Sequence, residues 1–301
     1  MKEDFYIIYN SYAKRGNSKH YLNAITSILN TTEEKYCLKP TEHRGHAADL
    51  MRQIIAKGGK QIIIIGGDGT IHEAANGTTP NDDVVLGIIP AGTGNDVATM
   101  LGLPFGVENV SVCMQNILAR SIKSIDIMTE QNSGRRSVLF FSYGIAANMV
   151  MTMEKYTKKS KLSYYRALIK HMFGYKAATY QIVINENDKR TVTADFLGLH
   201  NCIHAGGGMR LVHNAIIDDG LAEVFIVHYK GLLRRIANLI AIASGNAHKQ
   251  PNIEIIKATT LTINSPNNNL CCSDGEIILT NQLDIKLTHK GIKIFGGKCG
   301  K

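Results

Sequence analysis

The segment Gly66-Gly67-Asp68-Gly69-Thr70 has the residue types of a phosphate-binding turn. It follows the apolar run 61–65, a predicted strand, and precedes a helical pattern that begins at Ile71. Glycines let the backbone approach a phosphate closely and turn its N–H groups towards it, and the N-terminus of a helix adds a positive dipole. We expect Asp68 to handle Mg²⁺ or a proton, because a carboxylate beside a phosphate is otherwise repulsive. The alternative interpretation is a tight strand-to-helix turn with no ligand.

A second glycine-rich segment, Pro90-Ala91-Gly92-Thr93-Gly94-Asn95-Asp96, follows the apolar run 84–89. In a parallel sheet, ligands bind beyond the carboxyl ends of the strands. If the two strands are neighbours, the two loops together enclose a polyphosphate. Neither loop is a Walker A sequence, since no G-K-[ST] follows, and the protein-kinase motifs are missing as well.

The segment Asp274-Gly275-Glu276 places a carboxylate on a turn that enters a predicted strand. Phosphoryl transfer to a hydroxyl needs a group that takes up the hydroxyl proton. Glu276 is our candidate for this general base, and an ordinary hairpin is the alternative. Two further turn-like segments lie at 206–209 and 218–221, and the second contains two acids. A carboxylate amid backbone carbonyls can bind Mg²⁺.

The chain changes character near residue 124. Before it, continuous apolar strands alternate with helical patterns, which predicts an α/β domain with a parallel sheet covered on both faces. After it, short strands separated by Gly, Asn and Asp turns predict an antiparallel β-sandwich, with helices near 156–173 and 232–243. We predict an α/β nucleotide-binding domain at 1–126, a β-sandwich domain at 127–290, and a final strand at 291–301 that can return to the first domain.

The composition is that of a soluble globular protein, with 44% apolar and 20% charged residues in 301. No signal peptide is visible at the N-terminus, and the longest apolar runs, such as 236–243, fall far short of the roughly 18–20 residues of a membrane span. We expect a cytoplasmic protein with free thiols. The six cysteines are Cys37, Cys113, Cys202, Cys271, Cys272 and Cys299.

The net charge of +9 is uneven, with −1 over residues 1–126 and +10 over 127–301. Residues 155–176 hold seven Lys/Arg and no acid, interleaved with apolar side chains. This basic amphipathic pattern suits peripheral contact with an anionic membrane surface, and packing of a helix on its own domain is the alternative. We expect no nucleic-acid partner, because no nucleic-acid-binding motif accompanies the charge. The sequence leaves a homodimer open.

The motifs occur in the order G-G-D-G-T, P-A-G-T-G-N-D, N-x4-G-G-G-M, D-D-G-L and D-G-E. This order resembles the diacylglycerol kinase catalytic-domain family, specifically its soluble bacterial lipid kinases, which are relatives of sphingosine and ceramide kinases. NAD kinases share the first motif and are relatives in fold. The resemblance covers nearly the whole chain. It implies an ATP-dependent lipid kinase of phospholipid metabolism that uses Mg²⁺, with diacylglycerol as the default acceptor.

The resemblance also implies roles for individual residues. Glu276 maps to the proton acceptor, and Asp68 shares the catalytic role. The nucleotide-binding positions are Asn10, Ser11, Lys14, Thr41, Gly66, Gly67, Asp68, Gly69, Thr70, Ile71, His72, Gly92, Thr93, Gly94, Asn95 and Asp96. The acids that organise Mg²⁺ are Asp68, Asp96 and Asp126, and a second, structural Mg²⁺ maps to Asp219 with the backbone carbonyls of Ile216 and Leu221.

Four departures from the family pattern fall in the second domain. Ser142 stands where an Asn is usual, and residues 145–148 replace a glycine-phenylalanine-aspartate type of turn. His213 stands for a proline and Glu223 for an aspartate. These departures leave the identity of the lipid open. Two alternative functions also remain: an NAD kinase-like soluble kinase, and a catalytically silent regulator that binds nucleotide or membrane.

Overall fold

The computed structural model describes residues 3–10, 17–154, 166, 169–171, 173–205 and 209–296. The chain divides into two compact units, one of residues 1–125 with 290–301 and one of residues 126–289. The chain passes from one unit to the other after residues 125 and 289, each one residue before the predicted domain boundaries at 126 and 290.

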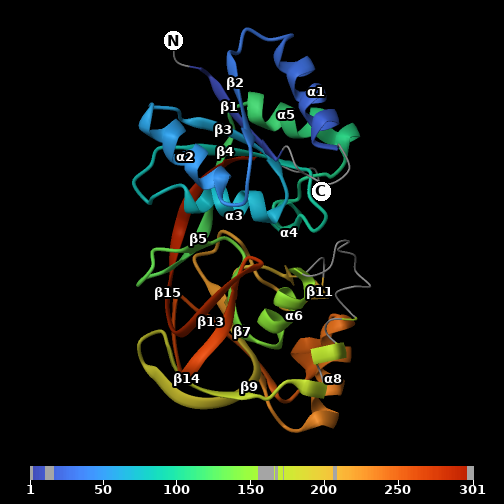
Figure 1. Ribbon diagram of the computed structural model, residues 1–301, viewed down its shortest axis with the longest axis vertical. Coiled ribbons are helices and arrows are strands. Elements are labelled where there is room, and N and C mark those ends of the chain that lie inside the picture. The colour runs from blue at the N-terminus through green and yellow to red at the C-terminus, as the bar shows by residue number, and fades with distance from the viewer. Residues whose placement is uncertain are drawn as a thin grey trace. The chain divides into compact units, whose positions relative to one another are not determined.

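The sheet of the first unit is parallel (Figure 1). Its strands follow the order β2 (Tyr36–Thr41), β1 (Phe5–Asn10), β3 (Gln61–Gly66), β4 (Val85–Pro90) and the end of β15 (Glu276–Phe295). The end of β15 pairs with β4 through Lys293 and Ile294, so the final strand adds to the first unit's sheet.

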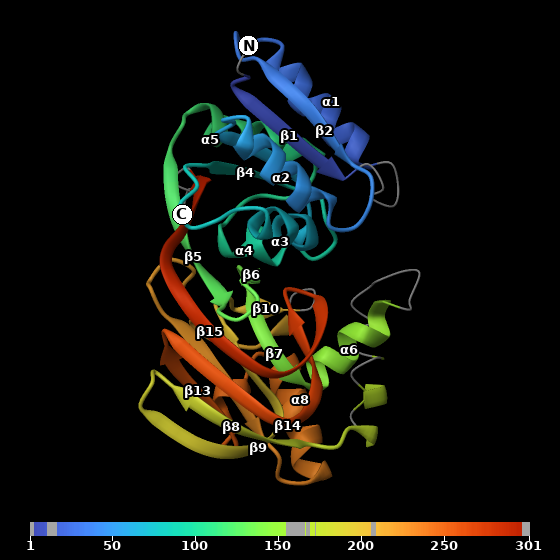
Figure 2. The ribbon, with the colours of Figure 1, turned by 60° about the vertical axis from the view of Figure 1, so that its left-hand side comes forward.

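Helices cover both faces of this sheet (Figure 2). On one face, α1 (Asn17–Leu29) and α5 (Val110–Leu118) bury their apolar sides against alternate strand residues such as Ile7 and Ile63. On the other face, α2 (His46–Ala56) packs on β1 and β2, and α3 (Asp68–Asn76) packs on β3. Burial on both faces explains why these strands are continuous apolar runs. The short helices α4 (Asp96–Met100) and η1 (Val107–Asn109) complete the unit.

Helix α3 begins three residues earlier than predicted. Asp68, Gly69 and Thr70 form its first turn instead of a loop, and Gly67 is the N-cap residue in an extended conformation. The amides of Thr70 and Ile71 donate to the Gly67 carbonyl at 3.0 and 3.2 Å. An acid in the first turn is favourable because it faces the positive end of the helix dipole.

The second unit is built from antiparallel strands around one core. Two long strands change neighbours along their length: β9 (Asp188–His200) pairs first with β8 (Ala178–Ile184) and then with β7 (Phe140–Gly144), and β14 (Thr260–Ser273) does the same. Strands shared between layers in this way form a sandwich. The other strands are β5 (Ile122–Glu130), β6 (Arg136–Ser137), β10 (His204–Ala205), β11 (Met209–Arg210), β12 (Ala222–His228) and β13 (Ile253–Ala258).

The structure differs from the predicted elements of the second unit at the last strand. The three strands predicted at 276–279, 283–287 and 291–295 are one strand, β15. Strand β14 pairs with residues 276–286 of β15, and the register shifts once, between Asn264 and Asn269 of β14. Residues 145–148, which replace a turn of the family pattern, begin helix α6 (Ile145–Glu154), and this helix packs on β7 and β14. The predicted helix 156–173 falls largely outside the described residues.

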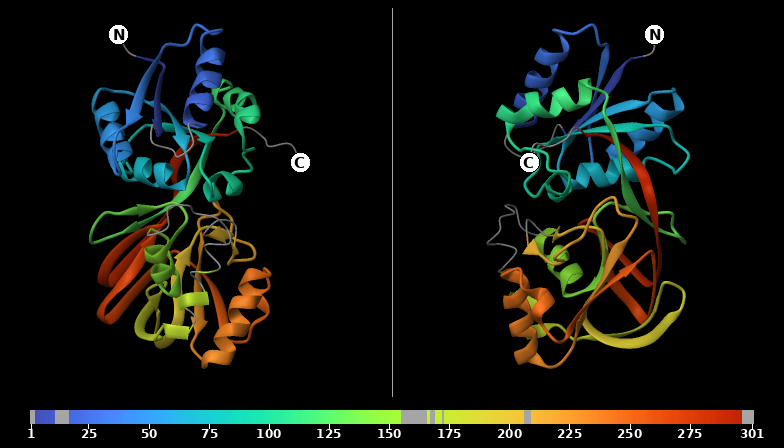
Figure 3. Two further views of the ribbon diagram at one scale, coloured as in Figure 1. Left: turned by 45° about the vertical axis from the view of Figure 1, so that its right-hand side comes forward. Right: turned by 180° about the vertical axis from the view of Figure 1, so that it is seen from behind.

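Helix α8 (Leu232–Ala243) has the predicted bounds and is followed by η2 (Ala247–Lys249). Figure 3 shows α8, in orange, at the outside of the second unit. Five cysteines, Cys37, Cys113, Cys202, Cys271 and Cys272, are free thiols, while Cys299 lies outside the described residues. Among the described helices, none is both long and apolar enough to cross a membrane.

Candidate active site

The nucleotide-binding positions predicted in the first unit gather at one edge of its sheet. Asn10 ends β1 in register with Thr41, the last residue of β2. Gly66 ends β3 in register with Pro90, the last residue of β4. Because all four strands are parallel, their carboxyl ends meet at the same edge, which is where ligands bind in such sheets. Ser11 and Lys14 lie outside the described residues.

The two glycine-rich loops touch each other directly, as the sequence predicts. A Cβ atom on Gly92 would lie 2.4 Å from the Cα atom of Gly67, and one on Gly67 would lie 2.9 Å from the Cα atom of Gly92. The amide of Ala91 donates to the carbonyl of Gly66 at 2.9 Å. Only glycines allow this approach, so the loops form one continuous backbone surface.

Asp68 connects the first loop to the helix that follows the second. Its Oδ1 atom accepts a hydrogen bond from the backbone amide of Val97 at 3.0 Å. A Cβ atom on Gly94 would lie 2.9 Å from the Oδ2 atom of Asp68, so the second loop passes close to the carboxylate. Asp68 therefore combines a structural bond with a position beside both loops.

Asn95 shapes its own loop. It has a left-handed backbone with φ 56°. Its side-chain oxygen accepts from the Gly92 amide at 2.9 Å, and its side-chain nitrogen donates to the Gly92 carbonyl at 3.0 Å. Asp96 follows as the buried first residue of α4. The side-chain amide of Asn95 thus fixes the conformation of the loop, and the backbone around Thr93 stays accessible to a ligand.

The remaining predicted contacts differ in their exposure. Gly92 and Thr93 are exposed, and a Cβ atom on Gly69 would meet nothing within 4 Å. In contrast, the side chains of Ile71 and His72 are buried, and a His72 ring nitrogen lies 3.3 Å from the side-chain nitrogen of Asn76. Gly69, Gly92 and Thr93 are therefore accessible to a ligand, whereas the side chains of Ile71 and His72 contribute to the interior of the unit.

Asp68 and Asp96 are the predicted Mg²⁺ positions in the first unit, and both lie beside the glycine-rich loops. Among the described residues, no group of three or more His, Cys, Asp or Glu side chains could hold a metal ion. Mg²⁺ is commonly held by one or two carboxylates together with phosphate oxygens and water. The position of Asp68 fits that arrangement, in which the nucleotide supplies the other oxygens.

In the second unit, Asp274 anchors the turn that carries Glu276. It is buried with a positive φ of 47°. Its carboxylate accepts hydrogen bonds from the Ser137 hydroxyl and from the amides of Val138, Leu139 and Phe140, the amides lying at 2.8, 3.1 and 2.8 Å. No role was predicted for Asp274, although an acid before glycine in a tight turn is a signal of such capping.

Replacing Asp274 with Asn is expected to destabilise the second unit by about 2–4 kcal/mol, because an amide nitrogen would face hydrogen-bond donors and the charge-assisted bonds would be lost. The midpoint of urea unfolding measures this. Asp188→Asn, which alters an exposed ion pair with Arg190, is the control and should shift the free energy by less than about 0.5 kcal/mol. Equal midpoints for the two variants would rule out the anchoring role.

Glu276 lies at the start of β15 in an ion pair. Its Oε2 atom is 2.8 Å from the Nη1 atom of Arg135, and its side chain remains partly exposed. The guanidinium holds the carboxylate in one orientation while leaving it accessible to a proton donor. Arg135 was not identified from the sequence, since 141 positions separate the two residues.

Asp126 and the turn at 219–221 come together within the second unit. Asp126 is fully buried, and its Oδ2 atom accepts from the Gly220 amide at 2.7 Å while its Oδ1 atom lies 2.8 Å from a His289 ring nitrogen. Asp219 accepts from the Leu221 amide at 3.0 Å and pairs with the ammonium of Lys257 at 3.0 Å. A cation at Asp219 would have to displace Lys257, so the structural Mg²⁺ with Ile216 and Leu221 stays a prediction.

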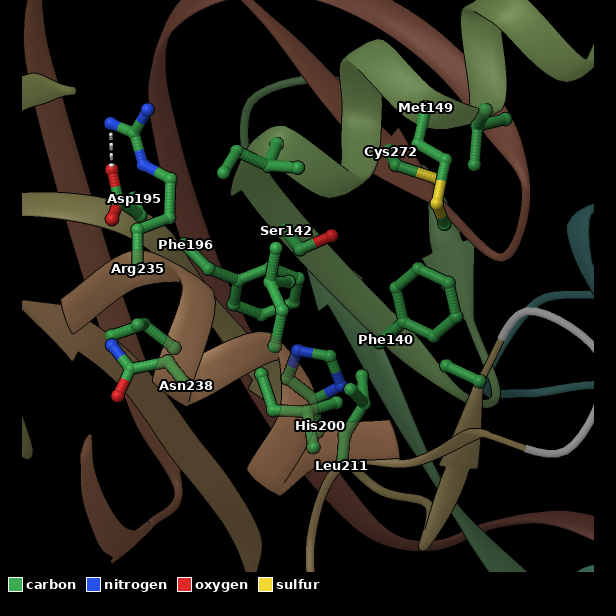
Figure 4. Close-up of a pocket in the computed structure, with 16 residues that line it drawn as sticks. Phe140, Ser142, Met149, Asp195, Phe196, His200, Leu211, Arg235, Asn238 and Cys272 are labelled. Carbon is green, nitrogen blue, oxygen red and sulfur yellow. Dashed lines mark hydrogen bonds and ion pairs between the residues drawn. The ribbon is translucent and has the colours of Figure 1, made fainter. Parts of the chain in front are cut away.

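A pocket of about 80 Å³ lies between the sheet and two helices of the second unit (Figure 4). Alternation along β7 and β9 directs Phe141, Tyr143, Leu197 and Leu199 into the core, and Phe140, Ser142, Phe196 and His200 to the opposite face. Helices α6 and α8 cover this opposite face with mainly apolar side chains. The pocket is therefore an apolar space on the outer side of the sheet.

Uncharged polar groups lie within this apolar lining. His200 is fully buried and stacks on Phe140, with ring centroids 5.3 Å apart. Burial lowers the pKa of His200 to about 3, so the ring is neutral. In the described part of the chain, neither of its ring nitrogens has a hydrogen-bond partner, and the same holds for the hydroxyl of Ser142 and the amide of Asn238. A ligand here would be largely apolar with uncharged hydrogen-bonding groups.

Comparison with known families decides the assignment of the chain. Residues 4–129 match the family model described as diacylglycerol kinase catalytic domain, and residues 140–295 match the one described as YegS C-terminal NAD kinase beta sandwich-like domain. The chain belongs to the diacylglycerol kinase catalytic-domain family. The first match covers most of the N-terminal unit, and the second covers most of the other unit together with the final strand residues 290–295.

Individual relatives agree with this assignment. A diacylglycerol kinase of Mycobacterium tuberculosis (strain H37Rv) is 21% identical over 258 residues, which cover 84% of this chain and 82% of that protein. The crystal structure of a diacylglycerol kinase from Bacillus anthracis has a TM-score of 0.74 and 20% identity, covering 98% of this chain and 97% of that one. An NAD kinase from Archaeoglobus fulgidus in complex with ATP has a TM-score of 0.57 and 9% identity, covering 98% and 94%. These structural likenesses show a common fold.

Proposed function

We propose that this lipid kinase family member transfers the γ-phosphate of ATP to the hydroxyl group of a lipid, most simply diacylglycerol or a related lipid alcohol. The observation that carries the proposal is the direct backbone contact between Gly67 and Gly92, which joins two glycine-rich loops at the carboxyl edge of a parallel sheet. A protein of the same fold, the NAD kinase from Archaeoglobus fulgidus, was solved in complex with ATP, so the fold is compatible with a nucleotide ligand.

The first unit would bind and orient the nucleotide. Backbone amides of the two loops and the N-terminus of α3 provide hydrogen-bond donors and positive potential for phosphates. When bound, Mg²⁺ would neutralise charge on the transferred phosphoryl group. Asp68 would help to hold the ion, and its bond to Val97 keeps the carboxylate in place beside the loops.

The second unit would provide the acceptor side. Glu276 would take the proton from the lipid hydroxyl as its oxygen bonds to the γ-phosphorus, and the bond to the β-phosphate oxygen would break to release ADP. Arg135 orients the carboxylate through its 2.8 Å contact. The apolar pocket with neutral His200 is suited to the chain of an uncharged lipid.

Two alternatives compete with this proposal. An NAD kinase-like enzyme would need to accommodate a charged dinucleotide, to which the apolar pocket of the second unit is poorly suited. A catalytically silent regulator would not need both Asp68 and Glu276, which this chain retains. We also propose that the protein is cytoplasmic and meets its lipid at an anionic membrane surface.

A kinase assay with labelled ATP, Mg²⁺ and total lipid extract tests the function. We expect label to appear in the organic phase, in a product that mass spectrometry identifies as a phosphorylated lipid alcohol. A parallel reaction contains NAD in place of lipid. Labelling of NAD alone would contradict the lipid assignment, and absence of any product in both reactions would favour the regulator.

A further inference from the structure

Helix α8 is amphipathic with its apolar face towards solvent. Successive residues are about 100° apart around a helix, so Leu233, Ile236 and Ile240 share one face. The side chain of Leu233 is 85% exposed and that of Ile240 is 64% exposed. A helix on the surface of a globular protein normally turns such a stripe towards the core.

The buried face of α8 carries two polar residues, Arg235 and Asn238, beside the apolar Ala241 and Ile242. Arg235 forms a buried ion pair with Asp195 at 2.7 Å and donates to the Tyr175 carbonyl at 3.0 Å. Asn238, one turn further on, is also buried, and both residues line the pocket. The ion pair keeps the helix in this orientation. Rotating the helix to bury the apolar stripe would pull Arg235 away from Asp195 and leave a buried carboxylate without its partner.

Further apolar side chains surround this stripe. Tyr229 and Leu232, at the start of α8, are exposed. The bond from Arg235 brings Tyr175 beside the helix, and Phe173, two residues earlier in the chain, is exposed as well. We call Leu232, Leu233, Ile236 and Ile240 the α8 face. Contiguous exposed apolar groups of this kind mark an interaction surface.

The charge around the α8 face favours an anionic partner. Residues 229–250 contain Lys230, Arg234, Arg235 and Lys249 and no acid. Arg234 lies in the first turn of the helix, where the positive end of the dipole makes a cation unfavourable in the isolated protein. Apolar side chains flanked by exposed cations are the pattern of a helix that lies in the interface of an anionic bilayer.

We propose that α8 docks the protein on an anionic lipid bilayer. Leu233 and Ile240 enter the interface between headgroups and acyl chains, and Lys230 and Arg234 meet lipid phosphates. The opposite side of the same helix lines the apolar pocket, so one helix separates the bilayer from the space suited to a lipid chain. This inference rests on the proposed function only in the choice of a lipid surface, and docking itself requires no catalysis.

Vesicle binding tests the inference. Wild-type protein and variants are sedimented with phosphatidylcholine vesicles that contain or lack phosphatidylglycerol. We expect Leu233→Glu and Ile240→Glu to lower the partition coefficient on anionic vesicles by at least about tenfold, because an apolar anchor is lost and a repelled charge is gained. Arg234→Gln should lower it by about fivefold.

Leu279→Glu is the matched control, since Leu279 is also 64% exposed but lies on β15. It should bind vesicles like the wild type. Binding of the α8 variants at wild-type strength, or no preference of the wild type for anionic vesicles, would overturn the inference. Sedimentation velocity without lipid tests whether the α8 face instead binds a second copy of this chain. If the wild type is a dimer and Leu233→Glu is a monomer, the α8 face is a dimer interface, and the inference of bilayer docking is overturned.

A kinase assay on a short-chain, water-soluble lipid alcohol without vesicles separates this inference from the proposed function. There the α8 variants should keep wild-type turnover, because neither Leu233 nor Ile240 lines the pocket. If the wild type binds anionic vesicles through α8 but phosphorylates no lipid, the proposed function fails and the docking surface stands. If it phosphorylates the soluble acceptor but α8 variants bind vesicles normally, only the docking surface fails.

Discussion

Replacement of Glu276 by Gln is expected to lower the rate of lipid phosphorylation by about 10²- to 10⁴-fold while the affinity for ATP stays the same. Gln has the same shape and can still accept a hydrogen bond from Arg135, which lies 2.8 Å from the carboxylate in the structure. It cannot take up the proton of the acceptor hydroxyl. Turnover with a saturating lipid and nucleotide binding by calorimetry measure the two quantities.

Glu254→Gln provides a matched control for Glu276→Gln. Glu254 also lies in the second unit, is similarly exposed and pairs with Arg190 at 2.9 Å, yet has no predicted catalytic role. We expect its turnover to remain within a few-fold of the wild type. If Glu276→Gln behaved like Glu254→Gln, the proton-acceptor role of Glu276 would be wrong.

Two substitutions of Asp68 distinguish the role of its negative charge from the role of its hydrogen bond in the loop. Asp68→Asn keeps an oxygen that can accept from the Val97 amide but removes the negative charge. Asp68→Ala removes both. If the charge holds Mg²⁺ at the phosphates, Asp68→Asn should lower turnover by about 100-fold and raise the Mg²⁺ concentration needed for half-maximal rate. Turnover measured against Mg²⁺ concentration gives both values.

The comparison of the two Asp68 variants decides between roles. A purely structural Asp68 predicts that the Asn variant keeps near wild-type turnover and that only the Ala variant is impaired, with a lower melting temperature. A metal-organising Asp68 predicts that both lose turnover, while the Asn variant melts like the wild type. Normal turnover in Asp68→Asn would therefore exclude the metal role.

Local patterns in the sequence determined the elements that carry the glycine-rich loops. Continuous Ile and Val runs predicted β3 and β4, and the glycines that follow them marked the strand ends, because these are local signals. The first loop is shorter than predicted, since Asp68, Gly69 and Thr70 already belong to α3. The bounds of α8 agreed with the structure for the same reason. The order of five motifs was sufficient to indicate the family, which the matches over 4–129 and 140–295 establish.

Elements that depend on distant partners were predicted less well. The last strand was divided into three pieces, because the polar residues Asn281 and Gln282 look like a turn in the sequence. In the structure they continue β15, which pairs with β14 on one part and with β4 at its end. Local sequence cannot show that a partner strand continues alongside.

Only the tertiary structure revealed how the side chains combine. Asp274 binds three amides and a hydroxyl from a segment more than 130 positions away, and Arg135 reaches Glu276 over a similar separation. The sequence by itself predicted a helix over 232–243, but not that Leu233 and Ile240 on this helix face the solvent. That orientation is set by the buried pair of Arg235 with Asp195 on β9, a contact between residues 40 positions apart. Periodicity reports which residues share a face, whereas packing decides which face is buried.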